Sequence, residues 1–489
     1  MQLSIKSLLG SVLLAAMPLV FTSCEGTLDD LFGEWSRPTP QTPTATIKFT
    51  AMNEFQDADN KVPKDVTIAK LTLKSSCLPN GQLVLDDQIT SPASSVTVSI
   101  PNPPSGEQSY DIVATDTEGN EWTAEGISLT LNQGNNPDKT VALFNANHYP
   151  LTLEATENAT TITVKNENGI SGIYYAIGGG AKTELTGTSQ NVSLQAGQRI
   201  QFFSTKSALG DANNANKCLN ITADKKCYAY GNVMSLIDDE ANGFHKDVTI
   251  AGNSAFAYLF YYNANLYNHE MRTIVLPATA LKYCCYSDMF NECTSLTSAP
   301  KLAATTLAEA CYQYMFLRCT SLTSAPELPA EALKDYCYQH MFEGCKSLAS
   351  APKLAATTLA EACYQYMFDG CKSLTTAPEL PAETLMDYCY AGMFNGCTSL
   401  TTAPELAAET LAEKCYQLMF SGCTKLASVT CKATNINANS CLIFWLNGAG
   451  TEATSPTVWV RSDMTSKGTA DSDGQWRTYG TSFNIAAIP

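Results

Sequence analysis

Cysteine is the residue type in this sequence with the widest chemistry, because its thiolate can act as a nucleophile, bind a metal ion or form a disulfide. The 489 residues include 19 cysteines and 4 histidines. Twelve of the cysteines form two series with a spacing of 26 residues, which run from Cys285 to Cys415 and from Cys293 to Cys423. A catalytic cysteine should be unique, and zinc sites usually contain Cys-x-x-Cys or neighbouring histidines, none of which occurs here. The sequence therefore predicts neither a Cys–His enzyme nor a metal site.

The repeated cysteines could be cross-linked or remain thiols. Cysteines at the same place in neighbouring coils of a repeat would lie roughly 5 Å apart, a separation that permits a disulfide. Side chains that stack in parallel do not point at one another, however, so we expect buried thiols that pack as small apolar groups. Outside the repeat, Cys218 and Cys227 flank a turn-like span. A disulfide that closes a hairpin and two separate thiols are both open there.

The element that must position these cysteines is the frame Cys-Tyr-x-x-Met-Phe-x-x-Cys-x-x-Leu, which occurs six times at intervals of 26 residues. Its first copy begins at Cys285 and its last at Cys415. A fixed period of this length is typical of arrays in which each unit stacks on the next. Within one copy, the Tyr, Met, Phe and second Cys have the i, i+3, i+4, i+7 spacing of one helix face. The frame therefore predicts one short helix in each repeat.

Flanking residues favour the same interpretation. Thr306 and Glu309 have the spacing of a capping box at the start of the predicted helix, and Gly344 and its equivalents would end it. The segment from Leu322 to Leu328 then predicts a strand, which the proline present in each copy should shorten. One short strand and one short helix per 26 residues is the plan of a leucine-rich-repeat α/β solenoid.

These residues resemble the BspA-like leucine-rich repeats of Gram-negative surface lipoproteins, in which Ala-Phe-x-x-Cys-x-x-Leu-x-x-Val-x-Ile-Pro recurs. Here Met-Phe replaces Ala-Phe, and Ala-Pro-x-Leu-Pro or Ala-Pro-x-Leu-Ala replaces the valine–isoleucine strand. The resemblance covers the chain from Ser254 to about Gly450. It implies a curved, right-handed array that serves adhesion or ligand capture at the cell surface.

The N-terminal residues predict export and anchoring of the chain. The apolar run Leu8–Phe21 is too short for a stable transmembrane helix and is typical of a signal peptide, which we place at residues 1–23. Cys24 follows a small residue and resembles the lipidation site of a bacterial lipoprotein; an ordinary secretory signal is the alternative. Residues 24–44 are acidic and then rich in proline, which predicts a stiff tether. The acidic part resembles an export signal to the surface of the outer membrane.

The rest of the chain divides into β-rich units and the repeats. Alternating apolar runs between turn residues predict an immunoglobulin-like β-sandwich at residues 45–147 and a second β-rich domain at 148–235. We expect an N-terminal cap with a degenerate repeat at 236–280, leucine-rich repeats at 281–431 and a C-terminal cap at 432–489. The two β-rich units carry no chemical signature, and we interpret them as spacers between the membrane and the repeats.

The exposed strand face of the repeats is the candidate binding surface. On the concave side of a solenoid this face would present rows of hydroxyl groups edged by lysine and glutamate. The candidate residues are Thr297, Ser298, Lys301, Thr323, Ser324, Glu327, Ser350, Lys353, Thr375, Thr376, Glu379, Thr401, Thr402 and Glu405. A solvated face without a ligand is the alternative interpretation.

Two further features could bind ligands. The tyrosine series from Tyr286 to Tyr416 could form a stacking stripe for sugars or proteins, but its place beside the cysteines favours core packing with the hydroxyl groups at the rim. Asp238, Asp239 and Glu240 could contact calcium. They lack the ligand spacing of a calcium loop, which favours a solvated loop.

Charge and missing motifs narrow the function. The chain has 30 basic and 47 acidic residues and a net charge of −17, which argues against nucleic-acid partners. No set of acid, base and nucleophile stands out and no cofactor is implied, so we expect a protein that is not an enzyme. The sequence predicts a lipid-anchored protein of the outer-membrane surface, whose repeats mediate adhesion or binding to a host or neighbouring-cell protein or glycan. A glycan-capture accessory of a nutrient-uptake system is the alternative.

Overall fold

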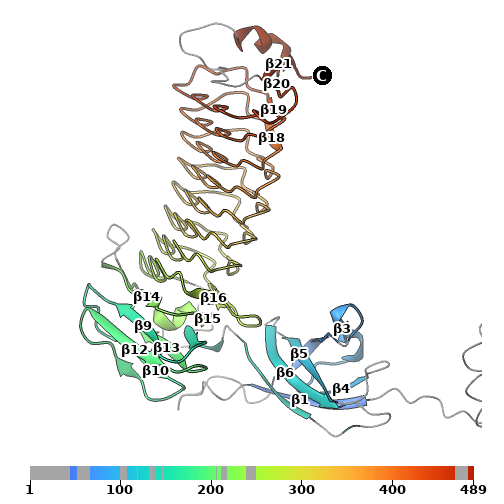
Figure 1. Cartoon of the computed structure of the whole chain (residues 1–489), viewed down its shortest axis with the longest axis vertical. Coiled ribbons are helices and arrows are strands. Elements are labelled where there is room, and N and C mark those ends of the chain that lie inside the picture. Colours follow the sequence, from blue (N-terminus) through green and yellow to red (C-terminus); the bar gives the residue numbers. More distant parts are fainter. Residues whose placement is uncertain are drawn as a thin grey trace, which may run out of the picture.

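The computed structural model places two β-rich units at the base of a column of stacked coils (Figure 1). The residues that it describes are 44–51, 66–76, 78–99, 107–117, 119, 121–130, 136, 139–145, 148–204, 206–210, 217–237, 249–468 and 483–489. The predicted signal peptide, the lipidation site Cys24, nearly all of the tether and the acidic cluster at 238–240 lie outside the described residues.

The first β-rich unit consists of two sheets that share one apolar core. One sheet has the order β4 (Ser95–Ser99), β1 (Thr44–Ala51), β7 (Lys139–Leu143). The other has the order β3 (Gln82–Val84), β2 (Ile68–Lys74), β5 (Glu107–Asp116), β6 (Glu121–Thr130), with short 3₁₀ turns η2 (Pro79–Gly81) and η3 (Asp86–Gln88) beside it. Ile47 and Phe49 from the first sheet and Leu71, Leu73 and Ile112 from the second are fully buried in the same cluster. The prediction of an all-β N-terminal part is confirmed.

The second β-rich unit also has two sheets, and the larger one continues into the column. Its order is β11 (Thr183–Glu184), β10 (Ile173–Ile177), β13 (Arg199–Ser204), β8 (Thr152–Ala155), β15 (Cys227–Asn232), β16 (Leu266–Asn268), and β17 (Ile274–Val275) also pairs with β15. The smaller sheet has the order β12 (Ser189–Leu194), β9 (Thr160–Lys165), β14 (Asn220–Ala223), and the 3₁₀ turn η6 (Val233–Leu236) follows β15. Because β16 and β17 follow the first coil and pair in parallel with β15, no break separates the two regions.

The described residues of the repeats contain no α-helix, so the predicted helix in each repeat is wrong. The segment is a run of consecutive β-turns. The amides of Cys285 and Met289 donate to the carbonyls three residues earlier, at 3.2 and 3.3 Å. Positive φ values recur at every fourth residue, at Cys284 (51°), Asp288 (56°) and Glu292 (62°). Positive φ at the third residue of a turn is the signature of type II.

The turn run explains why the sequence resembled a helix. Its conformation repeats every four residues, whereas an α-helix repeats every 3.6. Over the eight residues of one frame the two periods bring the same side chains to one face, and Tyr312, Met315, Phe316 and Cys319 are all buried. The predicted core is therefore right although the predicted backbone is not.

The amides that the turns leave over bind the neighbouring coil. Tyr286 N–H donates to the carbonyl of Cys311 at 3.0 Å, and Phe290 N–H donates to that of Met315 at 2.9 Å. An α-helix would keep these bonds internal and hold its neighbour 8–10 Å away, about twice the spacing of strands. In helix-containing repeats this difference in width causes curvature. Such a source of curvature is absent from the described coils, since both sides are spaced by hydrogen bonds.

The opposite side of the coils carries short parallel bridges. Ser324 bridges both Ser298 and Ser350, and the predicted effect of the prolines is visible where the bridges lengthen into strands. These strands are β18 (Thr402–Leu406), β19 (Ser428–Cys431), β20 (Thr457–Val460) and β21 (Asn484–Ala487), with the 3₁₀ turn η8 (Ser462–Gly468) between the last two. The β18–β19 register shifts between Thr402 and Glu405, around Pro404, whereas β19 and β20 pair without interruption. Proline cannot donate to the ladder, which explains the difference.

One apolar core runs from Leu151 in the second β-rich unit to Phe483 at the top of the column. Inside the coils, residues 26 apart lie directly over one another. The rings of Phe290, Phe316 and Phe342 stack at centroid separations of 5.4 and 5.6 Å with interplanar angles of 1° and 2°.

Candidate binding surfaces

The fourteen predicted binding residues all lie exposed along the bridged side of the coils, which we call the strand side. Their hydroxyl groups also connect the coils. Thr323 Oγ1 donates to the carbonyl of Thr297 at 3.1 Å, and Thr401 Oγ1 donates to that of Thr375 at 3.3 Å. Each hydroxyl oxygen can still accept hydrogen bonds from a ligand. The strand side thus offers a regular row of acceptors whose positions are fixed by the coils beneath.

Charged residues accompany this row at the spacing of the coils. Lys301, Glu327, Lys353, Glu379 and Glu405 occupy the same position in five successive coils and are all exposed. Glu405 pairs with Lys432 of the next coil at 2.5 Å. The surface is therefore mixed in sign rather than uniformly acidic, despite the negative charge of the whole chain.

The repeated cysteines are buried thiols, which matches the expectation from their parallel stacking. Those of the second series have a regular hydrogen-bond partner. Cys319 Sγ donates to the carbonyl of Phe290 and Cys345 Sγ to that of Phe316, both at 3.1 Å. Burial raises the pKa of these thiols, to about 12 for Cys363. They therefore stay protonated at neutral pH and are poor nucleophiles.

The candidate disulfide between Cys218 and Cys227 is absent from the structure. Cys218 precedes β14 in the smaller sheet of the second unit, whereas Cys227 begins β15 in the larger sheet. The span between them joins two sheets and does not form the hairpin that the disulfide prediction required. Both side chains are buried as thiols.

The tyrosine series faces the core, so it offers no stacking stripe to a ligand. Tyr312 is 2% exposed and stacks on Tyr286 and Tyr338 at 5.7 and 5.8 Å. The prediction of hydroxyl groups at the rim is wrong for Tyr286 and Tyr390, whose hydroxyl oxygens are buried without a hydrogen-bond partner. Their pKa is raised by burial, which keeps both hydroxyls neutral.

The outer surface of the turn run, which we call the turn side, carries ladders that the sequence analysis missed. Gln339 accepts an amide hydrogen bond from Gln313, and donates one to Gln365. His340 stacks between Tyr314 and Tyr366 at 4.8 and 5.0 Å. The signal was available, since each ladder uses residues 26 apart, but a helical backbone would not have aligned them.

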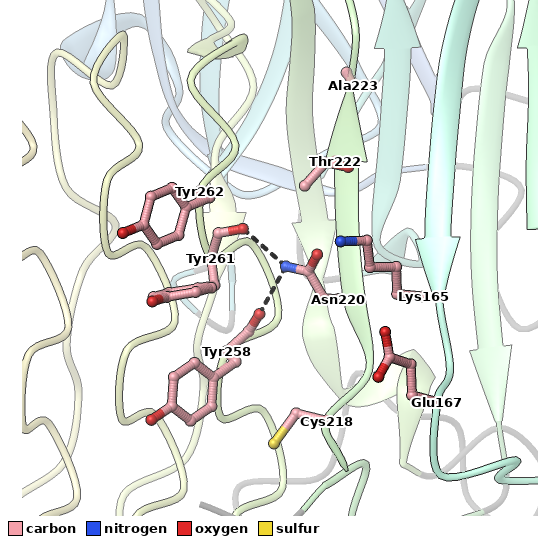
Figure 2. Close-up of a pocket in the computed structure, with 9 residues that line it drawn as sticks. All are labelled: Lys165, Glu167, Cys218, Asn220, Thr222, Ala223, Tyr258, Tyr261 and Tyr262. Carbon is pink, nitrogen blue, oxygen red and sulfur yellow. Dashed lines mark hydrogen bonds between the residues drawn. The ribbon is translucent and has the colours of Figure 1, made fainter. Parts of the chain in front are cut away.

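A pocket of about 410 Å³ lies where the first coil meets the smaller sheet of the second unit (Figure 2). Its lining residues are Lys165, Glu167, Cys218, Asn220, Thr222, Ala223, Tyr258, Tyr261 and Tyr262. Figure 2 shows the three tyrosines on one wall and the charged residues on the other. No motif in the sequence pointed to this pocket, because its walls come from segments about 90 residues apart.

The tyrosine wall is held by the sheet. Asn220 Nδ2 donates to the carbonyls of Tyr258 and Tyr261, at 3.1 and 2.9 Å. The rings of Tyr258 and Tyr261 meet edge to face at 5.1 Å, and those of Tyr261 and Tyr262 at 4.3 Å. Burial, followed by a hydrogen bond with Tyr262, raises the pKa of Tyr261 to about 12. Burial and the nearby Asp288 carboxylate raise the pKa of Tyr258. Both hydroxyls are therefore neutral donors at physiological pH.

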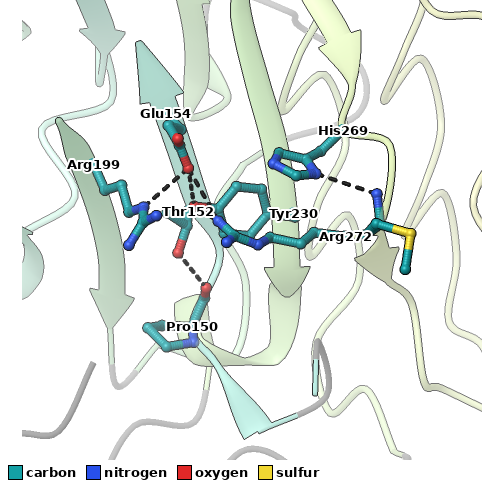
Figure 3. A network of polar contacts seen from close by, with 8 residues as sticks. Pro150, Thr152, Glu154, Arg199, Tyr230, His269 and Arg272 are labelled. Carbon is teal, nitrogen blue, oxygen red and sulfur yellow. Dashed lines mark hydrogen bonds and ion pairs between the residues drawn. The ribbon is translucent and has the colours of Figure 1, made fainter. Parts of the chain in front are cut away.

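A second polar cluster joins the β-rich unit to the column (Figure 3). Glu154 pairs with Arg199 at 2.9 Å and with Arg272 at 3.2 Å, and it accepts a hydrogen bond from the Tyr230 hydroxyl at 2.5 Å. Burial opposes ionisation of Glu154, but Tyr230 and the two arginines together lower its pKa below the usual value. Burial and Arg272 lower the pKa of His269 to about 4, so this imidazole is neutral. The cluster fastens the loop before the repeats to three strands.

Metal-binding and membrane-spanning features were also sought. Across the described ranges, no group of three or more His, Cys, Asp or Glu side chains could hold a metal ion. Within the same ranges, no helix has the length and apolar character needed to cross a bilayer. Neither the family models nor the curated proteins compared with this chain gave a match.

Proposed function

We propose that the column is a non-catalytic binding scaffold displayed at the outer-membrane surface by a lipid on Cys24, as in the BspA-like leucine-rich-repeat lipoproteins that its sequence resembles. The first β-rich unit, taken as immunoglobulin-like, and the second unit act as spacers below it. The observation that carries the proposal is the exposed strand side, with its fourteen hydroxyl-bearing and charged residues in register.

The chemistry of the strand side fits a protein ligand. Hydroxyl acceptors alternate with both signs of charge, and such a surface complements a polar protein surface better than a uniform polyanion or polycation. Each contact is exposed and individually weak, but contacts at a fixed spacing can be engaged together by one extended partner. Adhesion to a host or neighbouring-cell surface protein is the activity that this arrangement supports best.

The binding role is tested with the full chain and immobilised mucin and extracellular-matrix protein. The variant Lys301→Glu/Lys353→Glu makes the charged row acidic along its length. We expect binding to weaken by about tenfold or more, the range found when interface charges are reversed. Lys334→Glu/Lys372→Glu is the matched control, since both lysines are exposed in the same coils but lie outside the fourteen residues. Equal loss in both variants, or in neither, would reject the strand side as the binding surface.

The anchor is tested separately. Cys24→Ser removes the proposed lipid attachment, and we expect the chain to move from the membrane fraction to the soluble fraction, because no other anchor is proposed. Protease treatment of intact cells should degrade the unmodified protein if it faces outward. Retention of the Cys24→Ser variant in the membrane would contradict lipidation at this residue.

A further inference from the structure

We propose that the pocket between the first coil and the second β-rich unit is a saccharide-binding site for an uncharged sugar. This site is separate from the strand side, so it does not depend on the proposed adhesion. It favours the glycan-capture interpretation of the sequence for this part of the molecule.

The first argument is that the repeat fold does not require the exposed aromatic ring. Tyr262 occupies the last positive-φ position of its coil, with φ of 60°. The equivalent positions of the later coils are Glu292, Arg318, Gly344, Gly370, Gly396, Gly422 and Gly448. Glycine adopts this conformation without the steric cost that a tyrosine pays. Tyr262 is nevertheless 57% exposed, so its ring gains little from core packing.

The second argument is the chemistry of the two walls. The tyrosine rings offer flat apolar faces, on which the C–H face of a pyranose can pack, and phenol hydroxyls at their edges. Across the pocket, Asn220 and Thr222 supply an amide and a hydroxyl, while Lys165 and Glu167 add a donor and an acceptor. Sugar hydroxyls both donate and accept, so they can use all of these groups.

The charges on the polar wall select against ionic ligands. Lys165 lies at the end of β9 and Glu167 follows two residues later, so one positive and one negative group face the same space. A phosphate or carboxylate attracted by Lys165 would be repelled by Glu167, and an amine would meet the opposite pair of forces. An uncharged ligand with many hydroxyl groups avoids both penalties.

The third argument is that the pocket is preformed and of suitable size. Asn220 holds the carbonyls of Tyr258 and Tyr261, and the Ile221 amide donates to the carbonyl of Leu259 at 2.7 Å. Less conformational entropy is lost on binding when the walls are already fixed. The volume of about 410 Å³ lies within the range of roughly 300–1,000 Å³ typical of small-molecule sites.

The test is calorimetric titration of the full chain with maltohexaose, cellohexaose, xylohexaose and mannohexaose. We expect saturable binding of at least one of them. The variant Tyr262→Gly should weaken that binding by about tenfold, because loss of a stacking ring in a small site removes a main contact. This variant should fold normally, since glycine is the residue of most equivalent coils. Tyr261→Ala provides a second variant of the same wall.

Arg318→Gly is the matched control, because it makes the same kind of change at the equivalent exposed position two coils further on. We expect it to bind sugar within about twofold of the unmodified chain. Flat titrations with all four sugars would overturn the proposal, as would binding that survives both tyrosine substitutions. Binding of charged oligosaccharides in preference to the neutral ones would also overturn it. A chain that binds sugar but not mucin or matrix protein would leave this site standing and reject the adhesion proposal alone.

Discussion

The two long sides of the column carry the same 26-residue period but connect neighbouring coils in different ways. On the turn side every second amide donates to the next coil, and stacked rings and thiols lie beneath these bonds. On the strand side the prolines interrupt the ladder, which leaves isolated bridges and a few threonine hydroxyls as connections. Cohesion is therefore concentrated on one side of each coil.

This difference shows how a repeat can separate stability from recognition. The turn side and its core need the same residue type in each coil, because each ring packs on its own copy. The strand side has no such requirement, and its charged position changes from Lys301 to Glu327 and back to Lys353 without altering the stack. A surface of this kind can vary in sequence at little energetic cost.

The largest effect should come from breaking the phenylalanine stack. Phe342 is fully buried between Phe316 and Phe368, at 5.6 and 5.7 Å, and Phe342→Ala would leave a cavity that the rigid coils cannot fill. We expect a loss of about 3–5 kcal/mol in the free energy of unfolding of the column. Lys353→Ala, at the exposed strand side of the next coil, should change it by less than about 0.5 kcal/mol. Urea denaturation followed by tyrosine fluorescence measures both, and similar effects would refute the division between the sides.

An intermediate effect should come from the thiol series. Cys345→Ala removes the donor to the Phe316 carbonyl, which keeps only the Cys319 amide, at 3.1 Å. We expect a loss of about 1–2 kcal/mol from the missing hydrogen bond and the small cavity. Ser350→Ala on the strand side is the control, and thermal unfolding of both variants provides the comparison. A Cys345→Ala chain as stable as the parent would mean that the thiol hydrogen bonds contribute nothing.

The smallest effect should be a dependence on pH that is confined to the turn side. Burial and the neighbouring Glu343 raise the pKa of Asp369 from 3.8 to about 6, although Asn395 donates to its carboxylate at 3.1 Å. The fold therefore favours the protonated acid. Its stabilising contribution is complete below about pH 4 and is lost as the pH rises through about 6. We expect the melting temperature to fall slightly over this interval, and Asp369→Asn to flatten the profile.

The control for this prediction is Glu379→Gln on the strand side of the column. This variant should keep the pH profile of the unmodified chain, because Glu379 lies on the opposite side from Asp369. If Asp369→Asn retained the full slope between pH 4 and 6, the buried carboxyl would not be its source.

The sequence predicted the period, the buried residues and the exposed side, because each of these depends only on which residues recur. It also predicted the interruption by Pro404, since a missing amide has the same effect in any strand. The helix was wrong because eight residues cannot distinguish a repeat of four from one of 3.6. Tyr262 escaped notice for a different reason: its significance is visible only after it is aligned with glycines of later coils. The Glu154–Arg272 pair joins residues 118 positions apart, and no local pattern could have found it.

The stacking of each coil on its two neighbours alone has a mechanical consequence. A pull along the axis loads the interfaces in series, so the weakest one yields first while the others hold. Every coil that peels away releases 26 residues, up to about 90 Å of slack at full extension. A chain fixed at one end and gripped at the other would therefore lengthen in steps and absorb work before either attachment failed.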